Sequence, residues 1–125
     1  MAVKIAKYVS IGTNNIERSR KFYDGLLGDS DQISSAPGDA YGAWIDGEET
    51  TFCVYVPFDG EKATVGNGSM TGFVMDTTDE VDAMYTKALA LGASDEGAPG
   101  PRMPDFYGAY VRDPDGNKLV FCKMG

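Results

Sequence analysis

The chain has 125 residues, of which 42% are hydrophobic, and this size and composition fit one compact domain with a buried core. A net charge of −8 disfavours nucleic acid and anionic membranes as partners, and no hydrophobic run is long enough to cross a membrane. Two cysteines are too few for a disulfide framework, which favours a cytoplasmic location.

The first half of the chain predicts a strand, a helix and three further strands. Alternating hydrophobic residues indicate a strand over residues 4–13, and hydrophobic residues at helical spacing predict a helix near residues 15–27. A short strand near residues 32–34 leads into a hairpin over residues 40–57. Residues 58–68 are polar and glycine-rich, and we expect them to connect the two halves.

The second half predicts the same order of elements. A strand over residues 69–76 precedes a helix near residues 78–91. Glycine and proline crowd residues 97–104, which predicts a constrained loop, and a last hairpin follows over residues 109–122. Each half is therefore expected to be a β-α-β-β-β unit.

An internal repeat supports this division. Residues 40–53 align without a gap with residues 109–122, and the dipeptides Ala-Tyr, Asp-Gly and Phe-Cys recur at the same offsets. Such self-similarity predicts two copies of one structural unit. We therefore expect a single domain over residues 1–125, built from one module over residues 1–60 and a second over residues 65–125.

The turn of the last hairpin fixes the expected strand register. Proline, glycine, aspartate and asparagine in Asp113–Asn117 are strong turn formers, and a five-residue turn there pairs Arg112 with Lys118 and Tyr110 with Val120. By the symmetry of the repeat, Tyr41 would then lie opposite Thr51.

The sequence resembles the glyoxalase/bleomycin resistance/dioxygenase superfamily, also called the vicinal oxygen chelate fold. The resemblance covers nearly the whole chain and is carried by the stretches YVSIGTNNIERSRKFYDGLLG, TTDEVDAMYTKALALGA and YVRDPDGNKLVF. It implies an α+β fold of two tandem βαβββ modules that form a curved, cup-like mixed sheet with the helices outside. It also implies a homodimer. Members of the superfamily are metal-dependent lyases, isomerases and dioxygenases, and metal-free proteins that sequester antibiotics.

The resemblance also implies where a metal ion would be held in metal-dependent relatives, by His, Glu or Gln on equivalent strands. This chain has no histidine, and the corresponding positions are Tyr8, Thr51, Met70 and Val120. Hydroxyl, thioether and isopropyl groups do not make a divalent metal site, so we expect no metal and no cofactor. A displaced metal site stays open as an alternative, with the acidic candidates Asp39, Asp46, Glu48, Glu49, Asp76, Asp105 and Asp115.

Strand alternation then predicts which side chains line the cup. If Thr51 and Val120 face inward, the cysteines two residues later do so too, while Phe52 and Phe121 face the helices. The expected ligand-binding residues are Tyr8, Tyr41, Thr51, Cys53, Met70, Tyr110, Val120 and Cys122, with Trp44 and Arg102 as candidates at the rim.

Three functions stay open at this point. The first is a metal-free protein that binds a small aromatic or cationic molecule in the cup, because the lining is aromatic, sulfur-rich and almost uncharged. The second is an enzyme of lyase or dioxygenase type that uses a displaced metal site or tyrosine acid/base chemistry. The third is an interaction module whose cup is filled by its own side chains. No residue is assigned a catalytic role.

Overall fold

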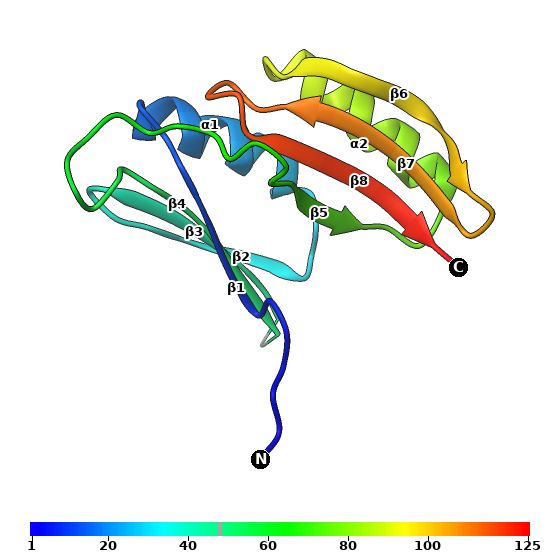
Figure 1. Cartoon of the computed structure of the whole chain (residues 1–125), viewed down its shortest axis with the longest axis horizontal. Helices are drawn as coiled ribbons and strands as arrows, with labels where there is room; N and C mark the ends of the chain where they lie inside the picture. The colour runs from blue at the N-terminus through cyan, green and yellow to red at the C-terminus, as the bar shows by residue number, and fades with distance from the viewer. Residues whose placement is uncertain (48) are drawn as a thin grey trace. The chain divides into compact units, whose positions relative to one another are not determined.

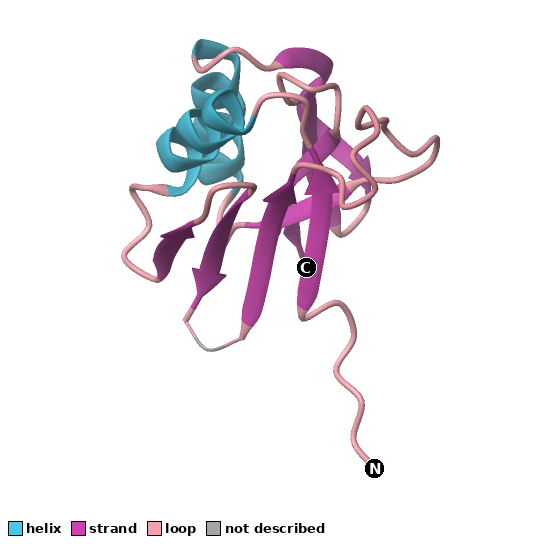
Figure 2. Cartoon of the chain, turned by 90° about the vertical axis from the view of Figure 1, so that its left-hand side faces the viewer, coloured by secondary structure: helices cyan, strands magenta, loops and turns pink. Residues whose placement is uncertain are grey.

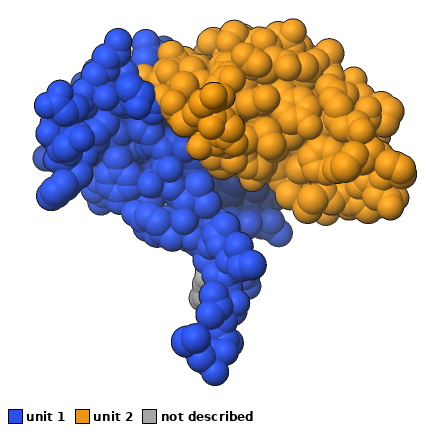
Figure 3. Space-filling model, in the orientation of Figure 1, with its two compact units in different colours: residues 1–64 blue, residues 65–125 orange. Residues whose placement is uncertain are grey.

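A computed structural model of the chain describes residues 1–47 and 49–125, so the acidic candidate Glu48 lies outside the described residues. The chain divides into two compact units, residues 1–64 and 65–125, which Figure 3 distinguishes by colour. Each unit is a four-stranded mixed sheet with one helix, so the α+β class and the β-α-β-β-β order are confirmed in both halves.

Unit 1 contains β1 (Tyr8–Gly12), α1 (Ile16–Leu27), β2 (Ile33–Pro37), β3 (Tyr41–Asp46) and β4 (Thr50–Tyr55) (Figure 1). Its strand order is β1-β4-β3-β2, with β1 parallel to β4 and the other pairs antiparallel. In Figure 2 these four strands lie side by side. The first strand is shorter than expected, since it begins at Tyr8 rather than at residue 4.

Unit 2 contains β5 (Thr71–Val74), α2 (Thr78–Ala90), β6 (Ser94–Met103), β7 (Phe106–Arg112) and β8 (Lys118–Met124) (Figure 1). Its strand order, β5-β8-β7-β6, repeats that of unit 1, again with one parallel pair, β5 with β8. Within the described residues, neither helix of the chain is both long and hydrophobic enough to cross a membrane.

The expectation of a loop over residues 97–104 is wrong, because most of this segment belongs to the edge strand β6. The strand pairs with β7 through three register shifts, between Asp95 and Gly97, between Gly97 and Gly100, and between Pro101 and Met103. An edge strand needs hydrogen bonds on one side only, and shifted register lets prolines occupy positions without an N–H partner. Glycine and proline therefore mark an irregular edge strand here.

Helix α1 forms where a capping residue precedes a hydrophobic stripe. The Asn15 side chain accepts a hydrogen bond from the backbone N–H of Arg18, which satisfies one of the free donors of the first turn. The stripe packs on the sheet through Tyr23, which is fully buried and whose ring centroid lies 5.4 Å from that of Trp44 and 5.0 Å from that of Phe52.

Helix α2 covers one face of the unit 2 sheet in the same way. Thr77 caps its first turn by accepting a hydrogen bond from the N–H of Glu80. The Tyr107 hydroxyl of β7 donates to Oδ1 of Asp82 on the helix at 2.6 Å, which shows that Tyr107 and its alternating neighbours face α2. Phe121 lies on this face, is fully buried and contacts the ring of Phe73 at 5.9 Å between centroids.

The predicted register is right for the second hairpin and wrong for the first. Arg112 pairs with Lys118 and Tyr110 with Val120, as the five-residue turn requires. In the first hairpin Tyr41 lies opposite Tyr55, and Thr51 lies opposite Ile45. The reason is the turn, because Asp46 already pairs with Thr50 and the first hairpin therefore reverses after fewer residues than the second.

Candidate functional site

The face of the unit 1 sheet that points away from α1 carries four of the expected ligand-binding residues. Trp44 and Phe52 contact Tyr23 of α1, so the residues that alternate with them along β3 and β4 point to the opposite face. The register of β1 with β4 adds alternate residues of β1 to that face. The structure thus brings together Tyr8, Tyr41, Thr51 and Cys53.

Small side chains form the middle row of this face. Ser10, Cys53 and Ala43 are register partners across β1, β4 and β3. The rows on either side of them carry three tyrosines, Tyr8, Tyr41 and Tyr55, which we call the tyrosine cluster.

The tyrosine cluster is held together by direct contacts. The hydroxyl oxygens of Tyr8 and Tyr55 are 2.6 Å apart and share a hydrogen bond, in which either residue can be the donor. The ring centroids of Tyr41 and Tyr55 are 5.6 Å apart with an interplanar angle of 34°. Tyr8 is 59% exposed and Tyr41 is 37% exposed, so the cluster presents aromatic surface and hydroxyl groups to a ligand.

Hydrogen bonding keeps the Tyr8 hydroxyl protonated. The bond to Tyr55, followed by a weaker one to the Cys53 thiol, raises the pKa of Tyr8 well above its ordinary value of about 10. Tyr8 is therefore a neutral phenol at physiological pH. It can donate or accept a hydrogen bond but is a poor general base there.

Both cysteines are free and buried, at 2% exposed for Cys53 and 3% for Cys122. Burial raises the pKa of the Cys122 thiol, which lowers the thiolate fraction at neutral pH. This environment is typical of an inert buried cysteine.

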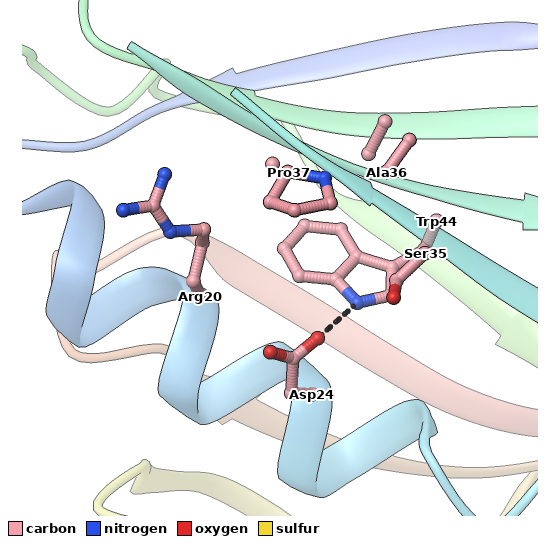
Figure 4. Close-up of a pocket in the computed structure, with 8 residues that line it drawn as sticks. Arg20, Asp24, Ser35, Ala36, Pro37 and Trp44 are labelled. Atoms are coloured by element: carbon pink, nitrogen blue, oxygen red, sulfur yellow. Dashed lines mark hydrogen bonds between the residues drawn. The ribbon is translucent and has the colours of Figure 1, made fainter. Parts of the chain in front are cut away.

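Trp44 does not lie at the rim of the face that carries Tyr41, where we expected it. It is 4% exposed and sits on the α1 side of the sheet, where its indole N–H donates to Oδ1 of Asp24 at 3.0 Å (Figure 4). Residues 41 and 44 are three apart in a strand, so they must face opposite sides. A pocket of about 40 Å³ next to the indole, between α1 and β2–β3, has room for only a few water molecules.

The unit 2 sheet also has a face directed away from its helix. Because Tyr107 faces α2, Tyr110 points to the other side, together with its register partner Val120 and with Cys122 two residues further on. Arg102 of β6 reaches the same face, where its guanidinium carbon lies 5.3 Å from the centroid of the Tyr110 ring.

A second cation approaches Tyr110. The ammonium nitrogen of Lys118 is also 5.3 Å from the ring centroid. Both distances are within the range of a cation–π contact. The Tyr110 ring therefore already contacts two cations of the chain itself. These contacts disfavour the stacking of a cationic ligand on this ring, which we had expected.

The residues at the family's metal-ligand positions do not fit a divalent cation. Tyr8 and Thr51 carry neutral hydroxyls, Val120 has no donor atom, and Met70 precedes β5 rather than belonging to it. Among the described residues there is also no cluster of three or more His, Cys, Asp or Glu side chains that could hold a metal ion.

Sequence reasoning missed two residues of these faces. Tyr55 lies two residues after Cys53 and four after Thr51, so strand alternation alone places it on the same face. The sequence predicts the pairing of Lys118 with Arg112. The approach of the Lys118 ammonium to the ring of Tyr110 depends on side-chain conformation, for which the sequence carries no signal.

Two tyrosines of unit 2 predict a measurable pH dependence. Hydrogen bonds to Asp95 and Asp82 raise the pKa values of Tyr85 and Tyr107, respectively, above the unfolded value of about 10. The contribution of these two hydrogen-bonded tyrosines to the stability of the fold is thus complete below about pH 10. It is lost as the pH rises through their pKa values in the folded protein. We expect Tyr85→Phe and Tyr107→Phe each to remove a late-titrating component from the tyrosinate absorbance of the native protein. Removal of a component that titrates at or below pH 10 would contradict the assignment.

Comparison with known proteins gives one family. The family model described as Glyoxalase/Bleomycin resistance protein/Dioxygenase superfamily matches residues 5–121. No curated protein matches the chain.

Solved structures of similar fold agree with that match. A glyoxalase/bleomycin resistance protein from Albidiferax ferrireducens T118 is 34% identical, with a TM-score of 0.88 over 98% of this chain and 100% of that one. A glyoxalase/bleomycin resistance protein/dioxygenase family enzyme from Burkholderia phytofirmans PsJN is 20% identical, with a TM-score of 0.77 over 96% of this chain and 98% of that one. The fosfomycin resistance protein FosX from Mesorhizobium loti is 15% identical, with a TM-score of 0.73 over 99% of this chain and 95% of that one, and shares the fold.

Proposed function

We propose that this chain, which belongs to the glyoxalase/bleomycin resistance protein/dioxygenase superfamily, binds a small planar molecule, aromatic or cationic, on the tyrosine cluster of unit 1 without the help of a metal ion. The observation that carries the proposal is the hydroxyl pair of Tyr8 and Tyr55, 2.6 Å apart, beside the exposed ring of Tyr41. The ring supplies a stacking surface, and the hydroxyl pair supplies a donor and acceptors that orient a polar group of the ligand.

The energies available at the tyrosine cluster suit a ligand of this class. Stacking of one aromatic pair contributes about 0.5–1.5 kcal/mol beyond the burial of its area, and a cation on a tyrosine ring contributes about 0.5–2 kcal/mol. Carboxylate side chains outnumber cationic ones in unit 1, which adds a favourable long-range term for a cation.

The alternative of tyrosine acid/base catalysis is less well supported by the same contacts. The raised pKa of Tyr8 keeps this residue protonated at physiological pH, so it is not poised to accept a proton. The alternative of a displaced metal site has no three-residue cluster of suitable side chains in its favour within residues 1–47 and 49–125.

Removal of the stacking ring tests the proposal. We expect Tyr41→Ala to weaken binding of naphthol and of N-methylquinolinium, two flat probes that differ in charge, by about two- to tenfold, because one stacked pair is lost. Amide chemical shifts measured during titration report both the affinity and the place of binding. In the parent protein the largest shifts should fall on Ser10 and Cys53, which lie between the tyrosines.

The hydroxyl pair has its own matched variants. Tyr55→Phe keeps the ring and removes one hydroxyl, so it should weaken naphthol, which can hydrogen-bond, more than N-methylquinolinium, which cannot. Tyr85→Phe removes a comparable hydroxyl in unit 2, where it bonds Asp95, and should leave both affinities unchanged. If each probe bound the Tyr41→Ala variant as tightly as the parent protein, the proposal would be refuted and an interaction module would be favoured instead.

We also propose that the chain forms a homodimer and is located in the cytoplasm. A homodimer would cover sheet edges, and each unit has two edge strands, β1 and β2 in unit 1 and β5 and β6 in unit 2. A reducing compartment such as the cytoplasm suits a chain whose two cysteines are both free thiols.

A further inference from the structure

The unit 2 sheet holds two cations without a carboxylate partner, although the chain is acidic overall. The chain has 11 basic and 19 acidic residues. Yet neither Arg102 nor Lys118 forms an ion pair with any residue that the structure describes, whereas Arg112 beside them is paired with Glu96 at 3.0 Å. We call Arg102 and Lys118 the cation pair.

The cation pair is gathered on one aromatic ring. Both charged groups lie 5.3 Å from the centroid of Tyr110, so they are within twice that distance of each other. Two like charges this close repel each other, and the ring offsets this repulsion only in part. An anion beside the ring, within reach of both charged groups, would relieve it.

The backbone around Arg102 leaves space for its guanidinium. A Cβ atom at Gly100 would lie 3.0 Å from Nη1 of Arg102, and one at Gly97 would lie 3.3 Å from Nη2 and 3.1 Å from Cδ2 of Tyr110. The guanidinium therefore lies against two glycines of β6, where Nη2 also donates to the carbonyl of Ala98 at 2.5 Å. This contact fixes the group in place and leaves most of its N–H donors free.

We propose that the cation pair and the Tyr110 ring form a binding site for an oxyanion group of a small molecule, a carboxylate or a phosphate. The planar guanidinium matches the two oxygens of a carboxylate, and the ammonium of Lys118 supplies a second charge-assisted donor. This site lies in unit 2 and does not rest on ligand binding by the tyrosine cluster of unit 1.

The test uses the full chain and two anionic probes, naphthoate and inorganic phosphate, with N-methylquinolinium as the probe of opposite charge. We expect naphthoate to shift the amide signals of Gly97, Gly100 and Tyr110, with an affinity that falls as salt is added. Tighter binding of phosphate at the same amides would assign the site to phosphate groups, and tighter binding of naphthoate would assign it to carboxylates.

Variants then distinguish the effect of charge on naphthoate affinity from the effect of the guanidinium position. Arg102→Gln and Lys118→Gln should each weaken naphthoate at least about fivefold, because each removes a charge-assisted hydrogen bond. Lys123→Gln is the matched control: it makes the same charge change on the same strand, but Lys123 pairs with Tyr107 on the α2 side, so the affinity should not change. Gly100→Ala should weaken naphthoate without any change of charge, since the added methyl group would displace the guanidinium.

Two outcomes would overturn the site. One is equal loss of naphthoate affinity in Lys123→Gln and Lys118→Gln, which would mean that only overall charge matters. The other is an unchanged affinity in both Arg102→Gln and Lys118→Gln. Loss of N-methylquinolinium binding in Tyr41→Ala bears on unit 1 alone, so failure of that proposal and failure of this one are distinguishable.

Discussion

Phe121→Ala should lower the free energy of unfolding by about 3–5 kcal/mol. The Phe121 side chain is fully buried on the α2 side of β8, and its ring contacts that of Phe73. Truncation to alanine removes this buried ring and leaves a cavity under the helix, which neighbouring side chains can fill only in part. Urea or guanidinium denaturation followed by circular dichroism measures the change.

Phe58→Ala provides the matched control, since Phe58 is fully exposed in the loop after β4. We expect that variant to stay within about 0.5 kcal/mol of the parent protein. Tyr110→Ala should also cost less than Phe121→Ala, because Tyr110 is only half-buried and lies on the face directed away from α2. If Tyr110→Ala proved the more destabilising of the two, the assignment of faces in unit 2 would be wrong.

The order of the elements was predictable from local signals. Hydrophobic residues at helical spacing, with a capping residue before them, located both helices to within one or two residues of their observed ends at Leu27 and Ala90. Strand alternation also separated the two faces of β4 and β8 correctly, since Phe52 and Phe121 face the helices. The same alternation, applied consistently, would have excluded Trp44 from the site and included Tyr55.

Register was predictable only where the turn itself is fully specified. The sequence Asp113–Asn117 contains proline and glycine at fixed positions and determines a five-residue turn. The first hairpin shares only the dipeptide Asp46-Gly47 with it, and its strands pair with a shorter connection. The sequence repeat therefore predicts that both units share a fold, but it does not predict the strand partner of Tyr41. That partner depends on the number of residues in the turn.

Side-chain chemistry was the least predictable part of the site. The sequence predicts Arg102 and Tyr110 as candidate ligand-binding residues, and its pattern indicates a ring open to a cationic ligand. The structure instead places Arg102 against glycines of β6 and over that ring. This arrangement depends on β6 being a strand, whereas glycine and proline had indicated a loop over the same residues.

The turn that joins β7 to β8 is held by a buried carboxylate. Asp113 is 4% exposed, and its Oδ1 accepts hydrogen bonds from the backbone N–H groups of Asp115 and Asn117, each at 2.9 Å. Its Oδ2 accepts a third from the side-chain amide of Asn117 at 3.0 Å. A single side chain thus satisfies three donors in a turn where the backbone cannot satisfy them itself.

Asp113→Ala should therefore lower the free energy of unfolding by about 2–4 kcal/mol, since the buried N–H of Asn117 and the partly buried N–H of Asp115 lose a charged acceptor. Asp113→Asn keeps one acceptor oxygen and should cost less, because the two backbone N–H groups remain paired while the amide of Asn117 meets another amide nitrogen. Asp59→Ala is the control: Asp59 accepts one backbone N–H, that of Glu61, in an exposed turn, so water can replace it. Denaturation midpoints of the three variants, measured under one condition, check the ranking.

A cost for Asp113→Ala no greater than that for Asp59→Ala would mean that the turn is held by its backbone alone. The register that brings Lys118 opposite Arg112 would then not depend on this carboxylate.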